Sequence, residues 1–247
     1  MNAAFKALLF VHVVFGTASV ILFWIPVIAK KGSSLHTRTG HWYAKAMYGV
    51  GITALCVCLM LMVDPIGFKF PNADFSATET AKIIAREKDT GLFLLAISIL
   101  TLVGVRHGLQ SIQAKGNHAK MRSIDNIAIN LILLLTGSWL GFTATGNSPL
   151  SVLFYIFAGL CIVISINNLR FCLKQKVTRG EQITAHLSAI IGAGIGAHTA
   201  FFLFGISRFL AGVFTGYLAL IPWVLPGIVG TIIIVQQAKK YRPKKQR

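Results

Sequence analysis

Two histidines inside long apolar runs are the residues of this chain best suited to chemistry. His12 lies in the first run, and His198 lies in the stretch GIGAHTAFFLFG at 194–205. An ionisable side chain at membrane depth is costly and usually faces a protein interior or a bound group. Each histidine is seven residues from the outer end of its run, or roughly 10 Å at the rise of a helix. The two imidazoles are therefore expected in one layer.

Each of these histidines also has a glycine one helical turn deeper on the same face. Gly16 follows His12 by four residues, and Gly194 precedes His198 by four. A flat group between the two rings would find space there. Because imidazole is a common axial ligand of haem iron, the pattern predicts a haem b bound through His12 and His198. Two alternatives stay open: imidazoles that only pack and hydrogen-bond, and imidazoles that relay protons.

A second polar layer lies at the opposite ends of the apolar runs. It includes His41, His107, His186 and Asp125. Three imidazoles and a carboxylate are ligands that zinc accepts, with an open position for water in a hydrolytic site. The alternatives are a second haem and an interfacial layer that meets headgroups and water. Since His186 and His198 are about 120° apart around one helix, a second haem would use His41 and His107.

The loop after the first apolar run is basic. It places His36 and Arg38 beside Lys30 and Lys31, and Arg106 belongs to the same side of the membrane. Such a cluster is expected to bind a phosphate or a lipid headgroup. The alternative is that its charge only anchors the topology of the chain.

The composition points to a membrane protein. Of the 247 residues, 55% are hydrophobic and 13% charged, and the mean hydropathy is +0.69. A soluble domain carries about 25% charged residues. The 24 Lys and Arg outnumber the 7 Asp and Glu, which in a soluble protein would suggest nucleic acid. Here the charges lie between apolar runs, so the expected partner is the lipid bilayer, and nucleic acid is not expected.

Seven segments are long and apolar enough to cross a bilayer as helices, which takes about 20 residues. The sequence thus predicts an all-α, polytopic integral membrane protein with seven transmembrane helices in a single domain over 1–247. The loops on one side and the basic tail 238–247 hold 18 of the 24 Lys and Arg. The positive-inside rule then places the N-terminus outside and the C-terminus in the cytoplasm, across a bacterial inner membrane. The predicted spans are 5–29, 42–63, 90–112, 125–145, 149–173, 183–205 and 216–237.

The one long outer loop, 64–89, holds five of the seven acidic residues. Ser76 followed by Glu79 is a capping-box pattern, which predicts a short interfacial helix before the third span. The loop is either a solvated connector or a lid that binds a partner.

Two further patterns concern packing. Asn126 and Asn130 share a helix face with Gly137 and Gly141, so this face of the fourth span is expected to look inward. None of the four cysteines falls in the outer loop, so no disulfide framework is indicated.

Three stretches resemble an uncharacterised bacterial family of multi-helix membrane proteins, known as a domain of unknown function. They are KKGSSLHTRTGHWYAKAM at 30–47, AHLSAIIGAGIGAHTAFFLFG at 185–205 and WVLPGIVGTII at 223–233. Family members similarly show a Lys-Gly stretch, His and Arg before a Gly, a Thr-Ala-Phe helix and a final Trp-Leu-Pro helix. This chain departs at Thr37, which stands where relatives place Arg, and delays the basic residue to Arg38. The resemblance implies a multi-helix membrane architecture and, since the family has no settled activity, leaves the chemistry open.

Three functions follow from these patterns. The first is a membrane redox protein in which haem b passes electrons between a quinol or soluble donor and an acceptor. The second is a proton- or ion-coupled small-molecule transporter that uses the same intramembrane histidines. The third is a zinc-dependent intramembrane hydrolase. Whether the chain is an enzyme stays open.

Overall fold

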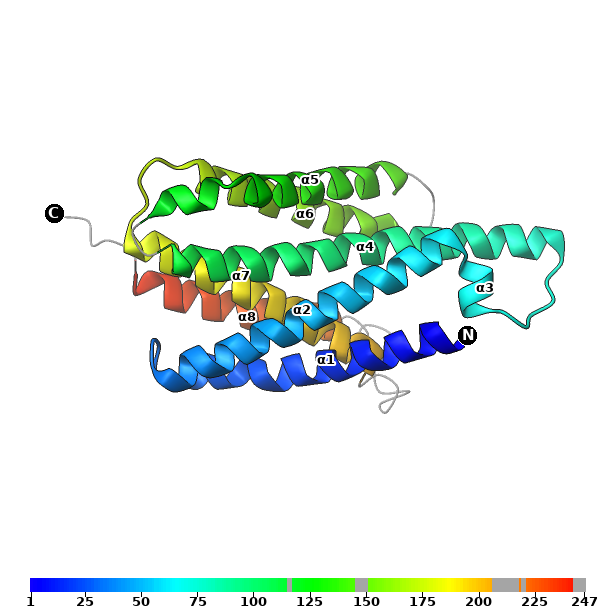
Figure 1. Cartoon of the computed structure of the whole chain (residues 1–247), viewed down its shortest axis with the longest axis horizontal. Helices are drawn as coiled ribbons and strands as arrows, with labels where there is room; N and C mark the ends of the chain where they lie inside the picture. The colour runs from blue at the N-terminus through cyan, green and yellow to red at the C-terminus, as the bar shows by residue number, and fades with distance from the viewer. Residues whose placement is uncertain (115–116, 145–150, 206–217, 219–220, 242–247) are drawn as a thin grey trace. The chain divides into compact units, whose positions relative to one another are not determined.

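The computed structural model describes residues 1–114, 117–144, 151–205, 218 and 221–241. These residues form helices joined by turns, and no strand occurs among them (Figure 1). A 3₁₀ turn, His118–Arg122, precedes α5, and a π-helix, Phe201–Gly205, follows α7. The α-helices are α1 (Ala3–Ile28), α2 (Ser34–Val63), α3 (Pro65–Lys69), α4 (Ala77–Gln113), α5 (Ile124–Thr143), α6 (Ser151–Leu173), α7 (Arg179–Ala200) and α8 (Ile221–Lys239).

Six of the described helices are long and apolar enough to cross a membrane. They are α1, α2, α4, α5, α6 and α7 with its π-helical extension to Gly205. This agrees with the predicted all-helical, multi-pass membrane protein. The seventh predicted span, 216–237, falls partly outside the described residues. Its described part is α8, whose apolar portion Val224–Lys239 is shorter than the other six.

The helices α2 and α4 begin well before the starts that the hydropathy pattern predicts. The second helix begins at Ser34, so His36 and Arg38 are helical rather than in a loop. The capping box before the third span does form: the Ser76 N–H donates to Glu79 Oε2 at 3.0 Å, and the Glu79 N–H donates to Ser76 Oγ at 3.3 Å. However, no proline or glycine interrupts 77–90, so the helix that starts there continues to Gln113 instead of forming a separate interfacial helix.

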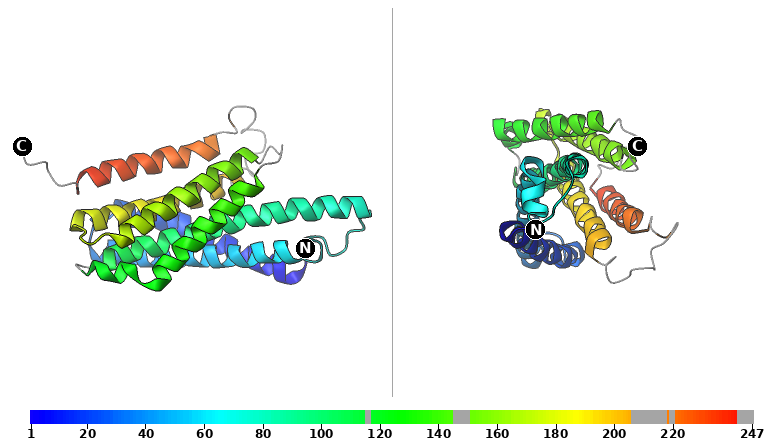
Figure 2. Two further views of the ribbon diagram at one scale, coloured as in Figure 1. Left: turned by 90° about the horizontal axis from the view of Figure 1, so that it is seen from above. Right: turned by 90° about the vertical axis from the view of Figure 1, so that its right-hand side faces the viewer.

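The chain divides into two compact units built from interleaved segments. Unit 1 comprises 1–15, 48–103 and 124–171, and unit 2 comprises 16–47, 104–123 and 172–247. Therefore α1, α2 and α4 each contribute one part to either unit, α5 belongs to unit 1, and α7 and α8 belong to unit 2. Within unit 2, α7 and α8 lie side by side (Figure 2).

The core of unit 1 joins α4, α5 and α6. Phe93 stacks on Phe154 with ring centroids 5.2 Å apart. A Cβ on Gly137 would lie 2.6 Å from the Cβ of Cys161, so this glycine sets the close approach of α5 and α6. The buried Asn168 amide donates to Asn130 Oδ1 at 3.0 Å. The predicted inward face of the fourth span is thus confirmed.

Glycines also set the helix packing in unit 2. A Cβ on Gly108 of α4 would lie 2.9 Å from the Ile190 side chain of α7. A Cβ on Gly230 of α8 would overlap the side chain of Ile195, also on α7. The helix α7 therefore packs closely against α4 and α8, as small residues allow in membrane helices.

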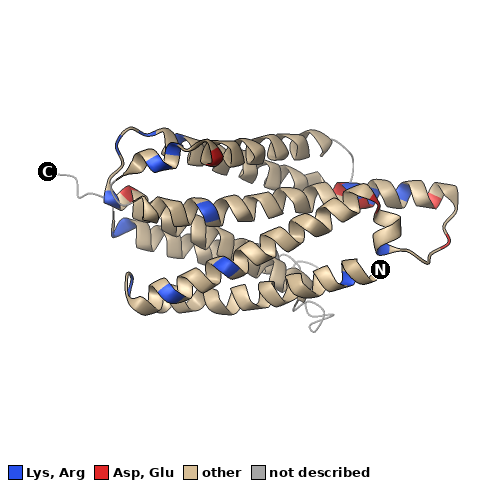
Figure 3. Cartoon of the chain, in the orientation of Figure 1, with Lys and Arg blue, Asp and Glu red and all other residues tan. Residues whose placement is uncertain are grey.

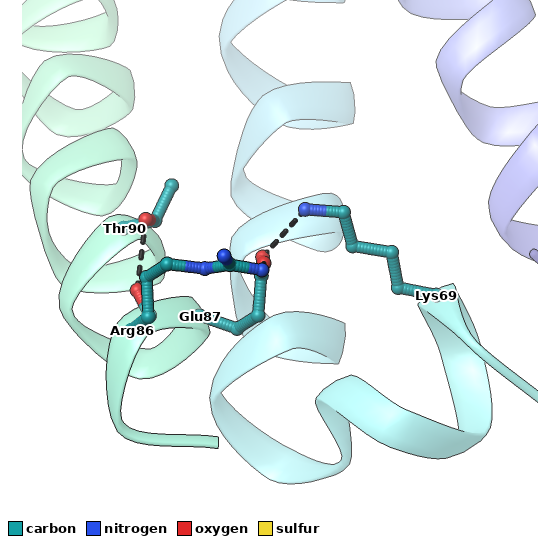
Figure 4. A network of polar contacts seen from close by, with 4 residues as sticks. All are labelled: Lys69, Arg86, Glu87 and Thr90. Atoms are coloured by element: carbon teal, nitrogen blue, oxygen red, sulfur yellow. Dashed lines mark hydrogen bonds and ion pairs between the residues drawn. The ribbon is translucent and has the colours of Figure 1, made fainter. Parts of the chain in front are cut away.

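A buried carboxylate ties α3 to α4 in unit 1. Glu87, only 2% exposed, accepts from Lys69 Nζ at 2.6 Å and from Arg86 at 3.0 Å (Figure 4). Asp64 caps the same short helix by accepting from the Gly67 N–H at 2.9 Å. The predicted outer loop is therefore folded onto the start of α4 by these contacts, and we call the Lys69–Glu87–Arg86 group the acidic clasp.

The two units differ in charge. Unit 1 contains six Lys or Arg and six Asp or Glu, whereas unit 2 contains eighteen Lys or Arg and a single acid, Glu181. Many of the described basic residues of unit 2 lie where α1 ends, where α7 starts and where α8 ends (Figure 3). We call this the basic end of unit 2.

Candidate functional site

Five histidines are each held in place through the Nδ1 atom of the ring. In each, Nδ1 lies within hydrogen-bond distance of a backbone carbonyl, which can only accept. Nδ1 must therefore carry a proton, and in the neutral ring Nε2 keeps its lone pair. The pairs and distances are His12 to Val50 O (3.2 Å), His36 to Pro26 O (2.9 Å), His41 to Thr37 O (2.7 Å), His186 to Gly108 O (2.8 Å) and His198 to Gly194 O (2.8 Å).

His198 sits in an aromatic cluster of unit 2. Its Nε2 accepts from the indole N–H of Trp24 at 3.1 Å. The ring of His198 lies edge-on to Phe23 and to Trp24, with centroids 5.0 and 5.5 Å away. Phe23 in turn packs edge-on against Tyr43 at 5.7 Å. Because indole is only a donor, the Trp24 contact independently fixes His198 as neutral with its proton on Nδ1.

The space beside Gly194 is filled by protein. A Cβ on Gly194 would overlap the ring of Phe23, and two further atoms of that ring would lie 2.7 and 2.9 Å away. The glycine that was expected to make room for a flat cofactor thus makes room for Phe23. A Cβ on Gly16 would meet no described atom within 4 Å. The two predicted cofactor-facing glycines therefore have different surroundings.

His12 is held by the second helix within unit 1. Besides Val50 O, its Nδ1 lies 3.0 Å from the hydroxyl of Thr53, and that hydroxyl donates to Gly49 O at 2.6 Å. The hydroxyl therefore accepts from the imidazole. No described residue hydrogen-bonds to Nε2 of His12. This nitrogen keeps its lone pair, which suits either a metal ligand or a proton acceptor.

An irregular helix segment follows His198 directly. The π-helix begins at Phe201 and ends at Gly205. Such segments are rare and frequently occur at functional sites, because the widened turn frees backbone groups and redirects side chains. The aromatic cluster around His198 and this irregular turn together form the candidate site of unit 2.

The predicted zinc ligands differ in burial and in their hydrogen-bond partners. His41 is exposed and bonded to its own helix, His107 is buried, and His186 is bonded to α4. Asp125 is exposed and belongs to unit 1, whereas the histidines belong to unit 2. Within the described ranges, no three His, Cys, Asp or Glu side chains are grouped so that they could hold a metal ion.

The predicted anion-binding residues are only partly brought together. His36 is half-buried in the first turn of α2, while Arg38 is exposed. Arg106 is half-buried in α4. The Pro26 carbonyl that holds His36 also accepts from Lys31 Nζ at 2.9 Å. His36 therefore belongs to a polar group at the end of α1, together with Lys31, and is not grouped with Arg38.

Sequence reasoning missed the partners of both intramembrane histidines. Trp24 and Phe23 are far from His198 in the chain, and Thr53 is 41 residues from His12. The sequence did hold a signal for Trp24: a tryptophan inside a span carries an indole N–H that needs a hydrogen-bond acceptor. His118, which is buried in the 3₁₀ turn His118–Arg122, was also not singled out from the sequence.

Comparisons of the chain with protein-family models, with curated proteins and with solved structures gave no match. The resemblance described above therefore stays an expectation.

Proposed function

We propose that the protein crosses a bacterial inner membrane seven times, with its N-terminus outside and its C-terminus in the cytoplasm. The six long apolar helices support a multi-pass arrangement. The helix α8 is the described part of the proposed seventh span. The excess of Lys and Arg at one end of unit 2 supports the orientation, because such residues are retained in the cytoplasm.

We further propose that it is a proton-coupled carrier of a small solute or ion, in which His198 is the residue that takes up the proton. The observation that carries this proposal is the Trp24 to His198 hydrogen bond of 3.1 Å. A proton on Nε2 would place a donor against a donor, so this hydrogen bond between α1 and α7 exists only in the neutral state. Imidazole changes charge near neutral pH, which suits such a role.

The structure around His198 supports a change of conformation on protonation. The hydrogen bond from Trp24 forms with the neutral ring and is lost when Nε2 is protonated, so the two protonation states differ in their contacts, which is what a population shift requires. The adjoining π-helix Phe201–Gly205 is an irregular segment of a kind that frequently occurs at functional sites. Loss of the indole contact would remove one hydrogen bond that ties α7 to α1 close to this irregular turn.

Proteoliposomes loaded with a pH-sensitive dye test the proposal. Carboxylates, amines and metal cations are added outside in turn, and the lumenal pH is followed. One class is expected to change the lumenal pH, and His198→Gln is expected to slow the change at least tenfold. His41→Gln, which alters an exposed histidine with the same backbone bond, serves as the control. A response that survives His198→Gln, or no response to any class, would refute the proposal.

A second candidate function is electron transfer through haem b, possible partners being a quinol or a soluble redox protein. The observation that favours it is the bond from Nδ1–H of His12 to Val50 O, since axial histidines commonly donate their other ring N–H to a carbonyl. His198 fits less well: Trp24 occupies its Nε2, and Phe23 fills the space beside Gly194. A haem would have to displace both side chains.

An absorbance spectrum separates the two functions. Haem binding predicts a Soret band and sharp α and β bands on dithionite reduction, both lost in His12→Ala and His198→Ala. A colourless preparation from haem-replete cells would eliminate this candidate and leave the carrier untouched. The zinc hydrolase has no supporting group among the described residues, and we do not propose it.

A further inference from the structure

The sequence of unit 2 carries a large excess of positive charge, eighteen Lys or Arg against one acid. The single acid of the unit, Glu181, already accepts from Lys174 at 2.7 Å and caps α7 through Thr178. Lys31 faces Lys240 instead of an acid, and burial, together with that second cation, lowers the pKa of Lys31. The net positive charge of the basic end therefore favours the approach of an anion from outside the chain.

Two histidines at this end are brought to the same place by the contact of α2 with α7. The Tyr43 hydroxyl donates to the Ile190 carbonyl at 3.4 Å. His36 lies seven residues before Tyr43, which is the same helix face within about 20°. His186 lies four residues before Ile190, again on the same face within about 40°. Both helices begin at the basic end, so both rings lie on that side of the contact.

Cationic or ionisable nitrogen groups lie near both rings. His36 and Arg179 both lie within electrostatic range of His186, and Lys31 shares the Pro26 carbonyl with His36. The Arg179 guanidinium is itself positioned by Gln182 Oε1 at 3.2 Å and by the Ile112 carbonyl at 3.4 Å. Three groups that can bind an oxyanion therefore converge from α2 and α7.

The rings are oriented before any ligand arrives. Backbone carbonyls hold the Nδ1–H of His36 and of His186 at 2.9 and 2.8 Å, so the same atom of each ring, Nε2, is available. A fixed orientation lowers the entropic cost of binding. This distinguishes the pair from the exposed lysines of the basic end, which carry charge without a fixed geometry.

We propose that His36, His186 and Arg179 form a binding site for a phosphate group at the basic end of unit 2. The guanidinium binds two phosphate oxygens, and each imidazole takes a proton from solvent onto Nε2 and donates it to a phosphate oxygen. The phosphate comes either from an anionic lipid headgroup, which lies at the level of helix ends, or from a free phosphate in solution. The site is independent of proton coupling at His198.

Binding to the full-length protein in an uncharged detergent tests the site. The probes are inorganic phosphate and short-chain phosphatidylglycerol, each titrated calorimetrically at constant ionic strength, and the thermal midpoint is followed in parallel. At least one probe is expected to bind saturably with uptake of protons. Arg179→Gln, His36→Gln and His186→Gln are each expected to weaken binding at least tenfold. The matched controls Lys176→Gln and His41→Gln remove a cation or an imidazole from exposed positions and are expected to change it less than twofold.

The results distinguish a free phosphate from a lipid headgroup, and either of these from the absence of a specific site. Binding of inorganic phosphate identifies a free anion as sufficient, and binding of phosphatidylglycerol alone identifies the lipid headgroup. Absence of saturable binding by both probes, or equal weakening in the controls, would overturn the site and show diffuse attraction instead. Arg179→Gln decides the matter if His186→Gln does not fold, because Arg179 is an exposed side chain at the start of its helix. Failure of the phosphate site would leave the transport proposal standing, because that proposal is tested separately by the flux that depends on His198.

Discussion

At the scale of single residues, the bond between Trp24 and His198 links a proton to a helix contact. Intrinsic fluorescence can report on it, because an imidazolium next to an indole quenches its emission. On acidification, we expect a change in emission with one midpoint as His198 takes a proton and the indole loses its acceptor. Trp24→Phe and His198→Gln should both abolish the change. Trp42→Phe, on the exposed start of α2, should retain it, and an acid response that persists without Trp24 would contradict the assignment.

A second residue-scale prediction concerns Gly194. Gly194→Ala places a methyl group against the ring of Phe23, so we expect a loss of about 1–3 kcal/mol in stability through overpacking. Gly196→Ala is the matched control: no described atom lies within 4 Å of its Cβ, and alanine favours helix by about 1 kcal/mol over glycine. Thermal midpoints in detergent measure both. In the double variant Phe23→Leu, Gly194→Ala, the second substitution should cost less than it does alone.

At the scale of elements, the acidic clasp holds α3 against α4. Glu87→Gln leaves Lys69 and Arg86 without their carboxylate, so we expect the segment 64–76 to open more readily, at a cost of roughly 1–3 kcal/mol. Limited proteolysis of the purified protein measures this opening. Asp89→Asn, which removes an exposed acid two residues further on, should leave the cleavage rate unchanged. Equal protection of wild type and Glu87→Gln would show that the apolar contacts of α3 suffice.

The helices also show how far sequence patterns reach. The ends of α1, α5 and α6 were predicted to within two residues, because there the apolar run and the helix coincide. The starts of α2 and α4 were missed by eight and thirteen residues. Hydropathy reports the thickness of the hydrocarbon layer, whereas a helix continues through polar residues until a breaker or a cap stops it.

Only part of the candidate site could be predicted from the sequence. His12 and His198 stood out because each is ionisable within an apolar run. Their partners could not be predicted, because the contact of Trp24 with His198 joins residues 174 positions apart, and one sequence carries no record of such pairings. The same limit applies to the ring of Phe23, which lies against Gly194; a cofactor at this glycine stays a prediction. The common level of His12 and His198 stays a prediction.

At the scale of the whole molecule, the charge of the basic end makes the orientation testable. A fluorescent protein fused after Arg247 should fold and emit, because we place the C-terminus in the cytoplasm. An alkaline phosphatase, which is active only after export, should be active when inserted after Asn72, near the acidic clasp. The reverse pattern of activities would invert the proposed topology, and activity of both reporters at one site would contradict a fixed orientation.

The anchoring of five imidazoles through one ring atom has a spectroscopic consequence. With ¹⁵N-labelled histidine, those five rings should give a single family of resonances, that of the tautomer protonated at Nδ1, in contrast to the mixture expected of freely rotating rings in water. An added solute, metal or lipid that engages one ring would move one member out of this family. The histidines thus form a built-in set of reporters, through which a ligand could be recognised before its identity is known.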